Sequence, residues 1–148
     1  MENKRIQHCS AEHLKRYGEI YAAAFSGEPW RSPWKREDAE AHVRELLESA
    51  QSYGLEYLID GKVVGFIMGA SMLFHYGRAF EINDLAVDPA YQRRGIGGKL
   101  LERCIEDARA QGVASVHLIT ASSGALSAFY EKYGFKPASE VMLMGLEL

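Results

Sequence analysis

Residues 92–99 read Gln-Arg-Arg-Gly-Ile-Gly-Gly-Lys and combine arginines with glycines. They lie between an apolar stretch typical of a strand and an amphipathic stretch typical of a helix. Glycines let a ligand approach the backbone closely, and the first N–H groups of a helix are free to bind an anion, which the helix dipole also favours. The segment therefore predicts a phosphate or pyrophosphate site. Its expected contacts are Gln92, Arg93, Arg94, Gly95, Ile96, Gly97, Gly98 and Lys99.

Two other phosphate-binding loops are excluded by spacing. A Walker A loop needs a glycine six residues before its lysine and a hydroxyl residue directly after it, but Arg93 and Leu100 stand at these positions. The dinucleotide-binding motif needs its third glycine where Leu100 stands. One alternative interpretation stays open, in which the glycines serve only a turn and the arginines are solvated.

The composition describes an ordinary globular protein, with 47% apolar and 25% charged residues among 148. This length predicts a single domain over residues 1–148. A net charge of −3 argues against a nucleic-acid partner. No apolar run reaches membrane length and no signal peptide is evident, so we expect a cytoplasmic protein without a membrane partner. Cys9 and Cys104 show no metal-binding or redox spacing, and no metal site is expected.

The elements that must position the anion site follow from hydrophobic periodicity. Strands are expected over residues 5–9, 55–59, 63–70, 80–87, 113–119 and 140–146. Helices are expected after an N-cap at Ser10, around residues 39–47, over residues 95–110 and over residues 123–133. Asp60-Gly61 predicts a two-residue hairpin turn. The order predicts an α/β domain: an antiparallel N-terminal meander is followed by a β-α-β crossover, giving a mixed central sheet with helices on both faces.

Three motifs follow one another in the second half of the chain. Leu85-Ala86-Val87 precedes a turn, the glycine-rich segment follows, and residues 129–135 read Phe-Tyr-Glu-Lys-Tyr-Gly-Phe. This arrangement resembles the GNAT superfamily of acetyl-CoA-dependent N-acetyltransferases, and the resemblance covers residues 80–136. It implies a GNAT-like fold, acetyl-CoA as cofactor, and direct acetyl transfer to a primary amine of a small molecule or peptide in a ternary complex.

The resemblance also assigns roles to individual residues. The glycine-rich loop would bind the cofactor pyrophosphate, and the backbone of Leu85, Ala86 and Val87 would pair with the pantetheine arm. Tyr130 would protonate or hydrogen-bond the departing thiolate. The helical pattern alone favours another interpretation, in which Tyr130 is a core aromatic that meets Phe135 in the contact closing the C-terminal cap of its helix.

Glu81 is the candidate general base, because some members of the family carry a glutamate at this place. An amine near the lysine pKa of about 10.4 must lose a proton before it attacks a thioester. A solvated strand carboxylate is the alternative interpretation of Glu81. Strand alternation places Asn83 on the same face as Glu81 unless a bulge intervenes, and turns Asp84 the other way.

One residue departs from the family motif, because Ser123 stands where many members carry an asparagine that contacts the cofactor. A serine can still donate one hydrogen bond or cap the following helix. On the acceptor side, Trp30, Arg31 and Trp34 lie in a loop that could wall a pocket for a cationic amine. Alternatively, the two tryptophans only seal the surface of the domain.

A second function stays open beside the enzyme: a non-catalytic sensor or regulatory module that binds acyl-CoA and transfers nothing. The presence of Tyr130 favours the enzyme. A homodimer formed through the last strand is a further expectation, which rests on analogy with this architecture.

Overall fold

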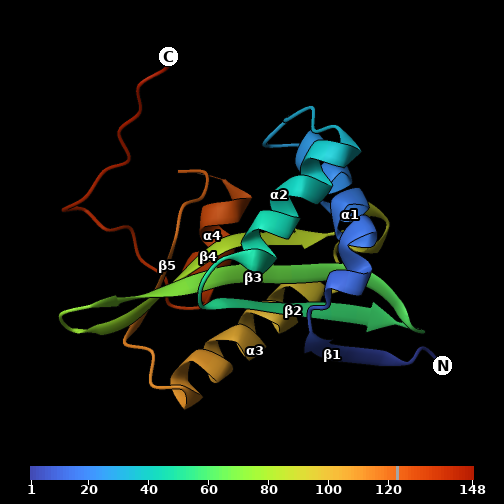
Figure 1. Cartoon of the computed structure of the whole chain (residues 1–148), viewed down its shortest axis with the longest axis horizontal. Helices are drawn as coiled ribbons and strands as arrows, with labels where there is room; N and C mark the ends of the chain where they lie inside the picture. The colour runs from blue at the N-terminus through green and yellow to red at the C-terminus, as the bar shows by residue number, and fades with distance from the viewer. Residues whose placement is uncertain (123) are drawn as a thin grey trace.

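The structure is a computed structural model that describes residues 1–122 and 124–148. Its centre is one mixed sheet of five strands in the order β1-β2-β3-β4-β5, where β1 is Lys4–His8, β2 is Ser52–Ile59, β3 is Lys62–Phe74, β4 is Gly77–Val87 and β5 is Ser115–Leu118 (Figure 1). The first four strands form an antiparallel meander, and β5 lies parallel to β4. The predicted fold class, including the order of meander and crossover, is confirmed.

Helices cover both faces of this sheet (Figure 1). The helices α1 (Leu14–Ser26) and α2 (Arg36–Glu48) pack on one face, where Tyr17, Val43 and Phe66 are fully buried. The helix α3 (Ile96–Ala110) packs on the other face with Leu100 and Leu101, and the aromatic side chains of α4 (Ala125–Lys132) join that core. The described residues also form the 3-10 turns η1 (Ala11–His13) and η2 (Pro89–Tyr91). None of the helices described is both long and apolar enough to cross a membrane.

Local chemistry explains several of these boundaries. Asp60 and Gly61 both have positive φ, as the predicted primed hairpin turn requires. Gly134 ends α4 with φ 95°, and the N–H of Phe135 bonds to the carbonyl of Tyr130. Ser10 caps the 3-10 turn that leads into α1, so that helix begins at Leu14.

A β-bulge interrupts the pairing of β3 with β4. Met68 lies opposite Asp84 and Gly69 lies opposite Ile82, so Asn83 is the extra residue. A Cβ atom built on Gly69 would lie 2.0 Å from the carbonyl oxygen of Glu81, so only glycine fits there without a backbone shift. The bulge reverses the alternation along β4 and therefore decides which side chains of its second half face α1 and α2.

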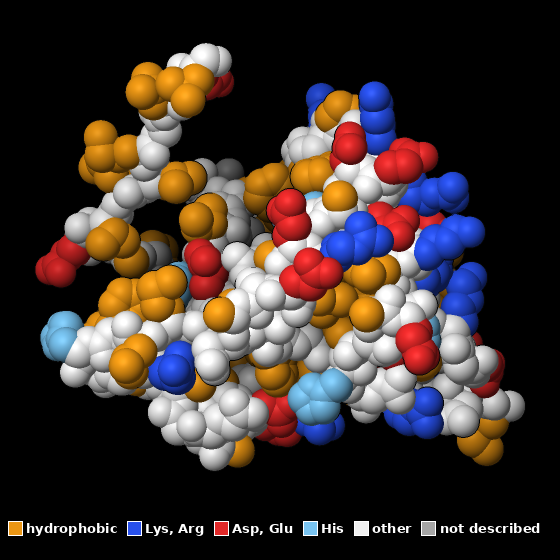
Figure 2. Space-filling view, in the orientation of Figure 1, with side chains coloured by type: hydrophobic (Ala, Val, Ile, Leu, Met, Phe, Trp, Pro, Cys, Tyr) orange, Lys and Arg blue, Asp and Glu red, His pale blue; other side chains and the backbone are white. Residues whose placement is uncertain are grey.

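The prediction of a last strand over residues 140–146 is wrong. Residues 141–148 form no strand and run away from the sheet, with their apolar side chains in solvent (Figures 1 and 2). Almost every position of this segment is apolar, which is typical of a strand covered on both faces. In one copy of the chain this segment has neither a neighbouring strand nor a second layer to cover it, and it stays unpaired.

Candidate active site

The predicted anion site lies at the beginning of α3. Gly95 adopts the left-handed conformation with φ 79°, and the N–H of Lys99 makes the first helical bond, to Gly95. The N–H groups of the preceding turn are therefore outside the helical ladder, as at any helix start. Arg93 and Lys99 are exposed beside them, and Arg94 lies over the ring of Tyr91. The loop can thus present amide donors and positive charge to an anion.

Three hydrogen bonds hold the segment between β4 and α3 in place. Arg16 of α1 bonds Asp88 at 2.6 Å, and the amide of Ala90 also bonds Asp88. Burial acts to raise the pKa of Asp88, but these two partners outweigh it and hold the pKa below its ordinary value. The side-chain amide of Gln92 donates to the carbonyl of Val87 at 3.0 Å. The loop and the strand end therefore form one unit.

The edge of β4 opens next to this loop. β5 pairs with β4 only from Ala79 to Ile82. Within the described part of the chain, no strand pairs with the same edge over residues 83–87, which include Leu85, Ala86 and Val87. Backbone groups left open in this way can pair with an extended ligand. The open edge and the helix N-terminus are therefore suited to one ligand that carries a diphosphate and an amide-containing arm.

Tyr130 of α4 lies near enough to Asp84 of β4 for the charge of that carboxylate to act on its phenol. It packs edge-on against Phe135, as the cap contact predicted, and against Phe129. Burial, together with the negative charge of Asp84, raises the pKa of Tyr130 to about 12. Its phenol is therefore protonated at neutral pH and can donate a hydrogen bond.

Glu81 and Asn83 lie at the bulge of β4. Phe80 and Ile82 face α3, so Glu81 faces the side of α1 and α2. The Glu81 carboxylate is 3.4 Å from the side-chain amide of Asn83 and 3.8 Å from His117 of β5. The Glu81 side chain is 40% exposed, and Asn83 is exposed. Both residues are thus within reach of solvent and of a ligand on that face.

Asp84 corrects the expectation from strand alternation. Because of the bulge, its side chain faces α1 and α2 and is 8% exposed. One carboxylate oxygen lies 2.8 Å from Nε2 of His42 on α2. Burial and the charge of Asp84 raise the pKa of Tyr21 on α1. The sequence analysis did not single out His42 or Tyr21. The available signal was that each carries a polar group on the otherwise apolar side of its helix.

The loop between α1 and α2 divides the predicted acceptor residues. Trp34 is partly buried, and its ring centroid lies 5.0 Å from that of Tyr21 and 5.3 Å from that of His42. Trp30 is 41% exposed, and Arg31 is exposed and bonds Glu28. The structure therefore places Trp34 beside Tyr21 and His42, whereas Trp30 and Arg31 lie at the surface. Ser123 lies outside the described residues.

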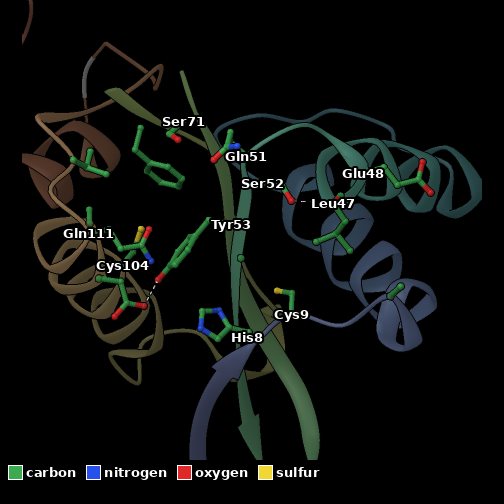
Figure 3. A pocket seen from close by; sticks show the side chains of 16 residues that line it. His8, Cys9, Leu47, Glu48, Gln51, Ser52, Tyr53, Ser71, Cys104 and Gln111 are labelled. Carbon is green, nitrogen blue, oxygen red and sulfur yellow. Dashed lines mark hydrogen bonds between the residues drawn. The ribbon is translucent and has the colours of Figure 1, made fainter. Parts of the chain in front are cut away.

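A separate cavity of about 510 Å³ lies where β1 ends beside β2, and none of the residues 92–99 lines it (Figure 3). Tyr53 and Cys104 line one side of it, and Cys9 and Leu47 line the other. Burial raises the pKa of each cysteine thiol to about 12, so neither is a nucleophile at neutral pH. Among the residues described, no cluster of His, Cys, Asp or Glu could hold a metal ion.

Comparison with known proteins tests the family resemblance that the three sequence motifs suggested. Residues 14–135 match the family model described as the acetyltransferase (GNAT) family. The chain belongs to this family. It is 32% identical over 126 residues to the N-alpha-acetyltransferase RimI of Mycobacterium tuberculosis, covering 82% of this chain and 72% of the relative.

Two further similarities are narrower. The chain is 46% identical over 57 residues to the [ribosomal protein bS18]-alanine N-acetyltransferase of Escherichia coli, a match that spans only 38% of either protein. The solved aminoglycoside N-acetyltransferase AAC(6')-Iy, in complex with CoA, superposes with a TM-score of 0.76 at 15% identity, covering all of this chain and 97% of that one. The last similarity shows that the GNAT fold is shared.

Proposed function

We propose that this protein transfers the acetyl group of acetyl-CoA directly to a primary amine. The observation that carries the proposal is the open edge of β4 beside the helix N-terminus of α3, in a chain of the GNAT family. When bound, acetyl-CoA supplies the thioester that the amine attacks. The loop of residues 92–99 binds its pyrophosphate, and the backbone of Leu85, Ala86 and Val87 holds its pantetheine arm.

Each step of the transfer needs a group on this chain. Tyr130 donates a hydrogen bond to the departing thiolate. Full proton transfer from a phenol of pKa about 12 to a thiolate whose thiol pKa is about 8.5 would cost about 5 kcal/mol, so the hydrogen bond is its main contribution. The amine must also lose a proton, and Glu81 is the candidate that the sequence indicates for this step, directly or through water.

Tyr130→Phe should lower kcat by about 100-fold and leave coenzyme A affinity unchanged, because only the hydroxyl is lost. Released thiol measures the rate, and calorimetry measures the affinity. Tyr76→Phe, an exposed tyrosine of the β3–β4 turn, is the matched control and should behave as wild type. Equal rates in both variants would reject the role of Tyr130.

A peptide N-terminal amine is the acceptor we propose first, because two relatives carry names of N-terminal or alanine N-acetyltransferases. Thiol release should appear with a peptide that has a free N-terminus and vanish with the same peptide blocked. Small-molecule amines complete the panel. Tight coenzyme A binding without thiol release from any amine would instead favour the acyl-CoA sensor.

We further propose that two copies associate through residues 141–148. Six large apolar side chains of this segment are at least 72% exposed: Val141, Met142, Leu143, Met144, Leu146 and Leu148. The outer edge of β5 carries no strand in the described structure, and Ile119 just beyond it is 64% exposed. If residues 141–148 paired with β5 of a second copy, the backbone groups of the segment and of the outer edge of β5 would bond to each other, and the apolar side chains would be covered.

Deleting residues 141–148 should convert a homodimer into a monomer, which light scattering coupled to gel filtration measures. Met144→Glu gives the same test without shortening the chain, because it places a charge within the proposed interface. A full-length chain that is monomeric at micromolar concentration would contradict the homodimer.

A further inference from the structure

Two charged residues are buried in the described part of the chain, Glu56 and Asp84. Glu56 is fully buried, and its carboxylate is bound by Gln7, His13 and Tyr17. Each of the two carboxylates holds a partly exposed imidazole, because the His13 side chain is 35% exposed and the His42 side chain is 32% exposed. Asp84 differs in its position, because it lies on the part of β4 whose edge is open, whereas Glu56 lies on β2 between two paired strands. A buried carboxylate that holds a solvent-accessible imidazole has the form of a proton-transfer pair.

The contact between the two residues fixes the imidazole. Nε2 of His42 lies 2.8 Å from Oδ2 of Asp84. A carboxylate can only accept there, so Nε2 carries a hydrogen and the lone pair of the neutral ring lies on Nδ1. Among the residues described, no hydrogen bond reaches Nδ1. That nitrogen is therefore available to accept a proton.

The surroundings of His42 place this nitrogen at the site. Asp84 lies within the open stretch of β4, residues 83–87, and its charge also acts on Tyr130. The rings of Tyr21 and Trp34 flank the imidazole at 4.8 and 5.3 Å. Tyr21 is 5% exposed and belongs to the core, so the partly buried Trp34 is the ring that can attract a cationic amine. An amine that approaches the open edge from the side of α1 and α2 therefore meets this ring and the imidazole of His42 together.

We propose that His42 removes the proton from the acceptor amine, with Asp84 as its positioning residue. This inference rests on the proposed acetyl transfer. The ammonium nitrogen gives its proton to Nδ1 of His42, and the nitrogen lone pair attacks the acetyl carbon. The C–N bond forms, the C–S bond breaks, and sulfur leaves with the electron pair. The excess proton of the new amide then passes to solvent or to the thiolate.

The charged and titratable groups around His42 together set its pKa. The hydrogen bond to Asp84 raises the pKa of His42, burial lowers it, and the charges of Asp84 and Glu45 raise it, so the net shift is upward. Tyr21 faces the same ring and stays neutral, because its own pKa is raised. An upward shift of the pKa makes the imidazole a stronger base than an ordinary histidine, which favours its acceptance of a proton.

His42→Gln should lower kcat/KM by about 100-fold for a strongly basic alkylamine. The loss should be less than about 5-fold for trifluoroethylamine, which is already unprotonated at neutral pH and needs no base. His75→Gln, at the exposed β3–β4 turn, is the matched control and should leave both rates unchanged. If His42→Gln lowers kcat/KM equally for both amines, the proposal is overturned. It is also overturned if Glu81→Gln, and not His42→Gln, loses rate only with the strongly basic amine.

Asp84→Asn tests the positioning role through the pH profile. Activity that needs neutral His42 rises with pH through the pKa of His42. The substitution removes the carboxylate charge that raises this pKa, so the midpoint of kcat/KM should move to lower pH. A purely structural role would lower the rate without moving the midpoint, which would overturn the role of Asp84.

Two further observations separate the possible failures. Circular dichroism and coenzyme A affinity show whether each variant is folded, and added imidazole should restore activity to a folded His42→Ala. If wild type releases no thiol with any amine, the acetyl transfer itself is wrong. If wild type is active and His42→Gln equals His75→Gln, only the role of His42 is wrong.

Discussion

Replacing Gly97 by tryptophan is expected to abolish coenzyme A binding while the protein still folds. A Cβ atom on Gly97 would lie 3.8 Å from Phe129 and 3.9 Å from Val87, which are ordinary contacts. The first side-chain atom therefore fits, but the indole ring must cover the N–H groups at the beginning of α3. Losing two charge-assisted hydrogen bonds costs about 3 kcal/mol or more, which is about 100-fold or more in Kd.

Calorimetric titration with coenzyme A measures this loss, and the thermal unfolding curve reports the fold. Glu102→Trp is the matched control, because it adds the same ring to the same helix on its exposed side. That variant should bind coenzyme A as wild type does. Unchanged binding in Gly97→Trp would mean that the diphosphate binds elsewhere, and the proposed reaction would lose its cofactor site.

The sequence predicted those features that depend on neighbouring residues. The helix expected over residues 95–110 is α3, Ile96–Ala110, and Asp60-Gly61 forms the expected turn. Gly134 and Phe135 end α4 as their residue types predict. Each of these features is decided by backbone freedom or capping within a few residues. The order of strands also followed, because turn residues and periodicity together limit how a short chain can cross its sheet.

The sequence could not predict features set by contacts between distant segments. The bulge at Asn83 depends on the pairing with Gly69, and alternation alone turned Asp84 to the wrong face. The contact of His42 with Asp84 joins residues 42 positions apart on different elements. In residues 141–148 the apolar run indicates burial, but the chain by itself does not provide the neighbour. The turns and helix ends were therefore predictable from local residue types, whereas the surroundings of His42 and Asp84 required the fold.

Gly69→Ala is expected to destabilise the fold strongly and to disturb the site at the same time. The new Cβ would lie 2.0 Å from the Glu81 carbonyl oxygen and 2.7 Å from the ring of Phe80. The first contact is with backbone, so no side-chain rotation relieves it, and β3 or β4 must move. We expect a loss of about 3 kcal/mol, or about 6–12 °C in Tm for a chain of this size.

Gly27→Ala is the matched control, because its Cβ would come no closer than 3.9 Å to another atom and its φ is −86°. That variant should unfold within about 2 °C of wild type. At a temperature where Gly69→Ala is still folded, its acetyl transfer should also fall, because the bulge sets the direction of Asp84 and hence the position of His42. If Gly69→Ala is as stable and as active as Gly27→Ala, then β4 does not bulge at Asn83, and Asp84 does not hold His42 at the open edge.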